Sequence, residues 1–162
     1  MSKKPGAFKE PIMEKNVQLD QLMPLFRERL EKGQTVRFMP RGVSMLPMLR
    51  QGIDSVVLSP LPDKLKKYDL PLYQRENGQY ILHRIVGVGE TYTCLGDNQF
   101  QKEYGLKHEQ MIGLVTEYYR GDKHRSVTDL RYKLYCRVWY RGRYLYRFAY
   151  RCKCRLKRLF KR

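Results

Sequence analysis

Between residues 34 and 119 the sequence is divided into short apolar or alternating segments that are separated by turn-forming residues. The clearest division is Asn77-Gly78, because Asn-Gly readily adopts the positive backbone angles of a tight hairpin turn. A second turn signal is Gly87–Glu90. The predicted strands are residues 35–38, 55–58, 70–74, 80–88, 92–95 and 111–118. Short strands at this spacing predict a mainly β domain of coiled, antiparallel sheet.

Helical patterns flank this β-rich region on both sides. Residues 17–32 repeat apolar side chains at intervals of three and four and precede Gly33, although Pro24 predicts a later start or a kink. A longer stripe is formed by Leu130, Leu134, Val138, Leu145, Phe148, Cys152, Leu156 and Leu159. This spacing is typical of one face of a helix of about eight turns. We therefore expect three parts: a lead-in and helix (1–33), a β-rich domain (34–119) and a basic amphipathic helical tail (120–162).

The positive charge is concentrated in the tail. The 162 residues carry a formal net charge of +17. Residues 1–119 hold 17 Lys and Arg against 14 Asp and Glu, whereas residues 120–162 hold 16 against 2. A basic helix with interfacial aromatics suits an anionic membrane surface, so peripheral membrane contact through residues 129–162 is the favoured interpretation. Nucleic-acid binding is less favoured, and docking on the body or on an acidic partner is the third interpretation.

The sequence contains no obvious membrane span or metal motif. No run approaches the roughly 20 apolar residues of a spanning helix, and Met1–Glu10 is polar and basic, unlike a secretory signal peptide. We expect a cytoplasmic protein, at most peripheral at the membrane surface. The four cysteines, at positions 94, 136, 152 and 154, lack the paired spacing of zinc ligands. Free thiols, and no metal or cofactor, are the expectation.

Three segments of the β-rich region carry possible chemistry. Ser44 follows the flexible Gly42 and precedes Pro47, a setting in which a serine can act as a nucleophile whose own amide binds the oxyanion. His83 lies inside an apolar strand; taken alone it is more simply a buried structural histidine, but its pKa suits a general base. Gly96-Asp97-Asn98 is ordinary turn chemistry that could also place a carboxylate beside the histidine.

In this order, the three segments resemble the type I signal peptidase family, which groups with the self-cleaving repressor peptidases. The resemblance covers residues 41–119, about half of the chain. Gly42-x-Ser44-Met45-x-Pro47 is similar to the nucleophile motif, and His83-Arg84-Ile85-Val86 to the base motif in its Ser–His version. Gly96-Asp97-Asn98 is similar to the acidic motif, while 69–73 and 111–115 are similar to flanking strands.

The resemblance implies a role for each matching residue. Ser44 would be the nucleophile and its amide an oxyanion donor, His83 the base, and Asp97 a residue that orients the site or holds its turn. Met45, Pro47 and Arg84 would contact the substrate. The implied fold is the coiled antiparallel sheet of these peptidases, with no cofactor or metal.

Several positions depart from the family's pattern. Gly42 replaces a second serine whose hydroxyl assists the oxyanion in many bacterial members. After Asp97 the usual second aspartate is missing, and Glu103 is only a loose candidate for it. The usual N-terminal membrane anchor is absent from the sequence, which leaves the substrate and the side of the membrane open.

We expect a serine endopeptidase that cleaves precursor or leader peptides through Ser44 and His83. Activity should rise as the pH passes the pKa of His83, near 6.5 in an unperturbed imidazole. Cleavage in trans is expected, because the chain has only two alanines and no Ala-x-Ala. The alternative is an inactive peptidase fold that binds anionic membrane or nucleic acid through its tail.

Overall fold

The computed structural model describes residues 19–159, with side chains beyond Leu145 described only at Phe148. The predicted lead-in, residues 1–16, lies outside this range. The chain is mainly β, with two antiparallel sheets, one helix before the strands and one after them. It divides into two compact units, residues 1–125 and 126–162.

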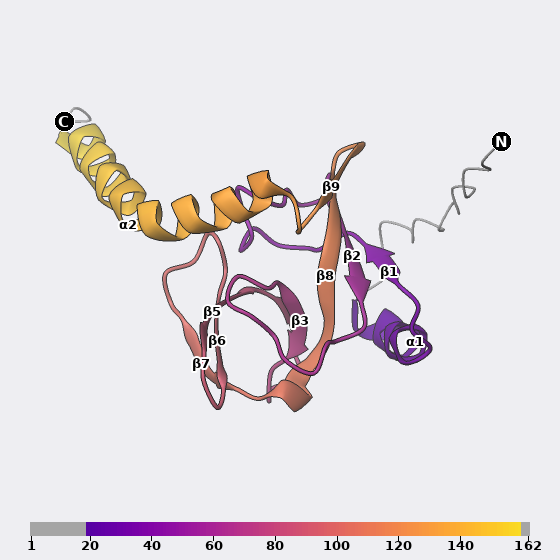
Figure 1. Ribbon diagram of the computed structural model, residues 1–162. Coiled ribbons are helices and arrows are strands. Elements are labelled where there is room, and N and C mark those ends of the chain that lie inside the picture. Colours follow the sequence, from indigo (N-terminus) through magenta and orange to yellow (C-terminus); the bar gives the residue numbers. More distant parts are fainter. Residues whose placement is uncertain (1–18, 160–162) are drawn as a thin grey trace. The chain divides into compact units, whose positions relative to one another are not determined.

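The larger sheet holds the strands in the order β1-β2-β8-β3-β4, with β9 paired to β8 (Figure 1). Their bounds are β1 Val36–Phe38, β2 Ser55–Ser59, β3 Pro71–Gln74, β4 Tyr80–Leu82, β8 Met111–Arg120 and β9 Lys123–Ser126. The ten-residue β8 is central, since it pairs with β2 on one side and β3 on the other. β4 is an edge strand of this sheet.

The smaller sheet is the meander β5-β6-β7, made of β5 Arg84–Val88, β6 Tyr92–Leu95 and β7 Glu103–Leu106. His83 is the single residue between β4 and β5, so the chain changes sheets at this histidine. A short 3-10 turn, η1 His108–Gln110, leads back from β7 to β8. A buried apolar cluster draws on both sheets and contains Leu65, Tyr73, Ile85, Tyr92, Cys94, Leu106 and Met111.

The first helix, α1 Leu19–Glu31, packs by its apolar face. Met23, Phe26 and Leu30 are buried, and the rings of Phe26 and Phe38 lie 5.5 Å apart between centroids. Pro24 lies inside the helix, which therefore begins before it. Gly33, at φ +73°, follows the helix, as predicted for its stop.

The predicted strands are present, with three differences. The segment expected as one strand, 80–88, is divided at His83 into β4 and β5, which belong to different sheets. The part expected as the helical tail, 120–162, contains β9 ahead of its helix. β7 was also missed, because Glu103–Leu106 has neither alternation nor an apolar run. The predicted hairpin at Asn77-Gly78 is confirmed as β3–β4, and the turn predicted at Gly87–Glu90 joins the antiparallel pair β5–β6.

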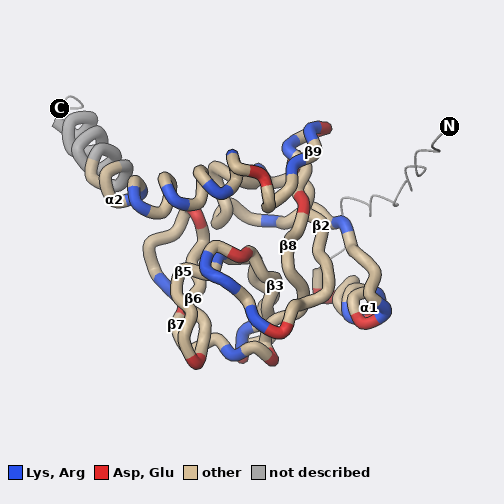
Figure 2. The backbone as a smooth tube through the Cα atoms, viewed as in Figure 1, with Lys and Arg blue, Asp and Glu red and all other residues tan. Residues whose placement is uncertain are grey.

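The second helix is α2 Leu130–Leu159, with the bounds that the apolar stripe predicted. Figure 2 shows Lys and Arg recurring along its described part. Of the stripe residues, Leu130, Leu134, Val138, Leu145 and Phe148 are exposed, while Cys152, Leu156 and Leu159 lie outside the described side chains. Within the described residues, no helix combines the length and apolarity needed to cross a membrane.

Candidate functional site

Ser44 lies in a tight turn that follows β1. Gly42, two residues earlier, has φ +94°, a conformation that other L-residues rarely adopt. Within the turn, the Leu46 amide donates to the Val43 carbonyl at 3.2 Å. Ser44 is half-buried, whereas Met45 is buried and Pro47 is exposed. The glycine therefore lets the chain turn just before the serine.

The Gly96-Asp97-Asn98 turn is bonded directly to the Ser44 turn. The Asn98 amide donates to the Ser44 carbonyl at 2.7 Å, and its side-chain Nδ2 donates to the Val43 carbonyl at 3.2 Å. The Gln99 amide closes the turn on the Gly96 carbonyl at 2.9 Å. Two segments about 50 residues apart in sequence are thus held side by side.

His83 meets this pair of turns at Gly96. Arg84 is paired with Leu95 in the β5–β6 hairpin, so the antiparallel register brings the preceding His83 beside the following Gly96. A Cβ atom at Gly96 would lie 3.0 Å from His83 Nε2 and 2.8 Å from the Ser44 carbonyl oxygen. The imidazole Nε2 and the Ser44 backbone therefore border the same small space, which only glycine leaves open.

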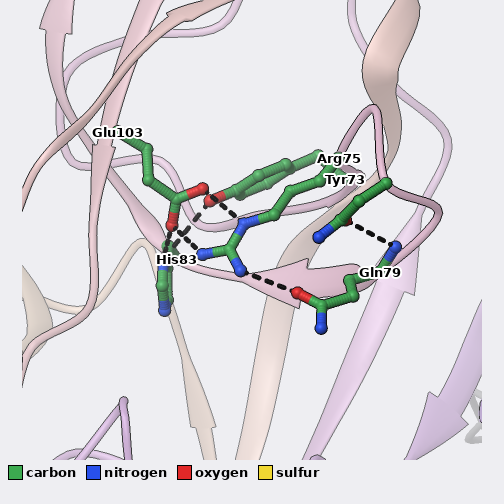
Figure 3. Close-up of polar contacts among 6 residues, drawn as sticks. Tyr73, Arg75, Gln79, His83 and Glu103 are labelled. Atoms are coloured by element: carbon green, nitrogen blue, oxygen red, sulfur yellow. Dashed lines mark hydrogen bonds and ion pairs between the residues drawn. The ribbon is translucent and has the colours of Figure 1, made fainter.

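The other ring nitrogen of His83 is held by a carboxylate. Glu103, the first residue of β7, places Oε1 2.9 Å from His83 Nδ1 (Figure 3). Arg75 donates to both oxygens of the same carboxylate, from Nη2 at 2.6 Å and from Nε at 2.8 Å. The Tyr73 hydroxyl lies 3.3 Å from Nδ1, and Nε2 points away from this network. Because a carboxylate only accepts hydrogen bonds, Nδ1 carries the proton and Nε2 presents its lone pair.

Burial and charge have opposite effects on the His83 imidazole. The residue is only 2% exposed, and this burial lowers the pKa of His83 below its ordinary 6.5 even though the Glu103 carboxylate raises it. Burial also raises the pKa of Glu103, but hydrogen bonds from Arg75 and Tyr73 outweigh it and hold that pKa below its ordinary value. Tyr73 stays protonated because burial raises its pKa far above the usual range. At neutral pH the site holds a neutral imidazole beside an ionised carboxylate.

Asp97 forms a two-pronged ion pair with Arg84. Arg84 donates from Nε to Asp97 Oδ1 at 2.9 Å and from Nη2 to Oδ2 at 2.8 Å, and both residues are buried. The same guanidinium contacts the Met48 sulfur at 3.0 Å and the Tyr68 carbonyl at 3.2 Å. This ion pair attaches the acidic turn to β5 and to the Ser44 turn. It gives Asp97 and Arg84 a shared positioning role.

A pocket opens beside Ser44 along the edge strand. Its lining includes Gly42, Ser44 and Met45 from the turn and all three residues of β4, Tyr80–Leu82. Its volume is about 70 Å³, enough for several water molecules or a small side chain. Pro47 is not part of this lining. Of the three residues expected to contact substrate, Met45 alone borders the pocket, and Arg84 is engaged by Asp97.

Cysteine and metal chemistry have no visible part in this site. Cys94 and Cys136 are free, and burial raises the pKa of the Cys94 thiol to about 12, which leaves it protonated and inert. In the part of the chain that the structure describes, no cluster of three His, Cys, Asp or Glu side chains could hold a metal ion. The chemistry available at the site is that of Ser44, His83 and Glu103.

Sequence reasoning brought Ser44, His83 and Asp97 together but gave Tyr73 and Arg75 no role in the site. Glu103 was the nearest acid after the turn, and the strand that carries it was not predicted. A search with family models, with the curated proteins and with the solved structures found no match to the chain. The functional argument therefore rests on the residues of the site.

Proposed function

We propose that the chain is a serine endopeptidase in which Ser44 is the nucleophile, His83 the general base and Glu103 the residue that orients the base. The observation that carries this proposal is the two-sided environment of His83. Its Nδ1 is bonded to an ionised carboxylate, while its Nε2 faces the small space beside Ser44. A base whose one nitrogen is bonded to a carboxylate and whose other nitrogen is turned toward the serine segment supports a serine–histidine–acid mechanism.

The mechanism begins with attack of Ser44 Oγ on a peptide carbonyl carbon, as Oγ transfers its proton to His83 Nε2. The Glu103 carboxylate stabilises the resulting imidazolium through Nδ1. The tetrahedral intermediate collapses with cleavage of the C–N bond, and Nε2 returns the proton to the leaving amine. Water then hydrolyses the acyl-serine ester by the same base. The Ser44 amide is the proposed oxyanion donor, because Gly42 has no hydroxyl to offer.

In this proposal the two acids have different tasks. Glu103 acts on the base, through the 2.9 Å contact to Nδ1. Asp97 acts on the scaffold, because its buried pair with Arg84 holds the turn that contacts Ser44. The resemblance left two roles open for Asp97, orienting the site or holding its turn. This proposal gives Asp97 the second role, and it gives the role of the missing second acid to Glu103.

The substrate is proposed to bind extended along β4. This strand is an edge of its sheet, so its outer backbone groups can pair with an added peptide strand. The pocket next to Ser44 would then accept a small side chain of that peptide. Precursor or leader peptides in extended form fit this surface. The same proposal includes the likeness to signal peptidases in sequence and the coiled-sheet arrangement of that family.

Digestion of a peptide library by the parent and by Ser44→Ala, side by side, tests this function. We expect defined cleavage sites with the parent and none with the variant. Ser59→Ala removes a serine hydroxyl that bonds Thr116 on the sheet instead, and serves as the matched control that retains activity. Cleavage by Ser44→Ala at the parental rate would exclude the proposal.

The alternative class, a binding module without catalysis, is separated by covalent labelling. A serine-directed phosphonate should label the parent at Ser44 and leave Ser44→Ala and acid-treated protein unlabelled. A parent that neither cleaves the library nor reacts with the probe, while remaining folded by circular dichroism, would be a binding module.

A further inference from the structure

An exposed apolar stripe runs along the described part of α2. Leu130, Leu134, Val138, Leu145 and Phe148 are between 59% and 80% exposed. At 3.6 residues per turn these five side chains fall within a sector of about 80°. Large aliphatic side chains that repeat on one helix face are more than scattered surface residues, and such a face ordinarily has a partner.

Positive charge borders this stripe on both sides. Arg137 and Arg131 are exposed and flank the sector, and Arg141 lies within it. From Leu130 to Leu159 the helix carries eleven Lys and Arg and no Asp or Glu. Arginine can extend its charged end toward a polar boundary while its stem lies along apolar surface. The helix therefore pairs an apolar stripe with a cationic rim.

We propose that α2 lies on an anionic lipid surface, with Leu130, Leu134, Val138, Leu145 and Phe148 inserted at the level of the acyl boundary and the arginines at the headgroups. The positive rim favours anionic over neutral lipid by charge complementarity. Insertion of the apolar stripe removes its side chains from water and so adds to the free energy of binding. This proposal does not depend on the proposed peptidase function.

The exposed side chains favour lipid over nucleic acid. Positive charge increases the affinity of a protein for a phosphate backbone, whereas aliphatic side chains such as Leu and Val add little to it. Proteins that bind single-stranded nucleic acid without sequence preference also use aromatic rings, on which bases stack. On α2 the rings of Tyr135 and Trp139 are stacked on each other, at 6.1 Å and an interplanar angle of 11°. The side chains that extend furthest into solvent on the stripe are mainly aliphatic.

Vesicle flotation of the full-length chain tests the proposal. We expect binding to vesicles of equal parts phosphatidylcholine and phosphatidylglycerol, and at least about tenfold weaker binding to phosphatidylcholine alone. Raising the salt from about 0.1 to 1 M shortens the Debye length from about 10 to 3 Å and should weaken binding to the anionic vesicles. Equal binding to both vesicle types, or none to either, would overturn the proposal.

A charge-neutral variant separates the stripe from the rim. Leu134→Ser/Val138→Ser should lower the partition constant on anionic vesicles by about tenfold or more, because the variant lacks two aliphatic side chains that the parent removes from water when it binds. The matched control is Ile53→Ser/Val88→Ser, which changes two exposed aliphatic residues of the body. Equal losses in the two double variants would contradict insertion of the stripe.

Two other occupants of the stripe would overturn the lipid assignment. Tighter binding of a single-stranded RNA oligonucleotide than of anionic vesicles would identify nucleic acid as the partner. A dimer in sedimentation velocity that Leu134→Ser/Val138→Ser converts to monomer would identify a second copy of the chain. Cleavage of library peptides in solution should be the same for the parent and Leu134→Ser/Val138→Ser, so failure of the lipid proposal is distinguishable from failure of the peptidase proposal.

Discussion

Glu103→Gln is the substitution that tests the proposed site most directly. Glutamine keeps the size of the side chain and one carbonyl acceptor but removes the charge that faces His83 Nδ1 at 2.9 Å. A hydrogen bond to a charged group contributes about 1.5–3 kcal/mol. Loss of that support for the imidazolium should lower kcat/KM by about tenfold to a few hundredfold, at 1.4 kcal/mol for each factor of ten.

The pH profile distinguishes this role from a structural one. In the parent, burial lowers the pKa of His83 below 6.5, so activity should be complete at neutral pH and fall on acidification below that value. The Glu103 charge opposes that lowering, so Glu103→Gln should shift the acidic limb of kcat/KM to still lower pH.

The assay is cleavage of a fluorogenic peptide chosen from the library digestion, followed from acid to neutral pH. Glu76→Gln, the same substitution at an exposed hairpin position, is the matched control and should leave both rate and limb unchanged. Full activity in Glu103→Gln, or a lower rate with an unmoved acidic limb, would refute the orienting role of Glu103.

Three further substitutions test the scaffold. Gly96→Ala should abolish cleavage, because the added Cβ would lie 2.8 Å from the Ser44 carbonyl oxygen. The control Gly89→Ala, whose added Cβ would have its nearest contact at 3.8 Å, should keep parental activity. Equal activities of the two variants would contradict this prediction. Asp97→Asn should lower the free energy of unfolding in urea by about 3 kcal/mol, because it removes the charge that pairs with the buried Arg84. It should move the acidic limb less than Glu103→Gln does, because the Asp97 charge raises the pKa of His83 less than the Glu103 charge does. Asp54→Asn should cost about 1–3 kcal/mol. Burial raises the pKa of Asp54, but the hydrogen bonds to its carboxylate outweigh burial and lower that pKa. The contribution of Asp54 to stability is therefore present above its pKa in the unfolded chain and is lost as the pH falls through its pKa in the folded chain. If the stability of Asp54→Asn depended on acid pH as the parent's does, this reasoning would be refuted.

Local signals predicted much of the fold. Asn77-Gly78 marked the β3–β4 hairpin because Gly78, at φ +86°, adopts an angle that suits few other residues. Alternation and apolar runs identified the strands of the larger sheet except β9, and the stripe gave both ends of α2. The division of 80–88 at His83 was not predicted, because the apolar residues before and after His83-Arg84 are also compatible with one continuous strand.

The short strands that were missed failed for a physical reason. β7 has the burial pattern intermediate, exposed, exposed, buried, so its residues carry no period of two. It is a strand because β6 offers it hydrogen-bond partners, with Cys94 opposite Glu103. Such a strand forms because of the strand beside it, and a local stretch of sequence does not show which strand that will be.

The roles proposed for Asp97 and Glu103 also depend on tertiary neighbours that the sequence does not reveal. Asp97 lies closer to His83 in sequence and belongs to a turn that touches Ser44, so proximity along the chain favoured it. The turn, however, presents its carboxylate to Arg84, whose fork matches both oxygens. Glu103 reaches Nδ1 because the β5–β6 and β6–β7 registers align Ile85, Cys94 and Glu103 in one row, and His83 precedes Ile85 by two residues. Replacing one acid at a time therefore tests the register of the smaller sheet as well as the chemistry: if Asp97→Asn moved the acidic limb and Glu103→Gln did not, both that row and the proposed orientation of His83 would be wrong.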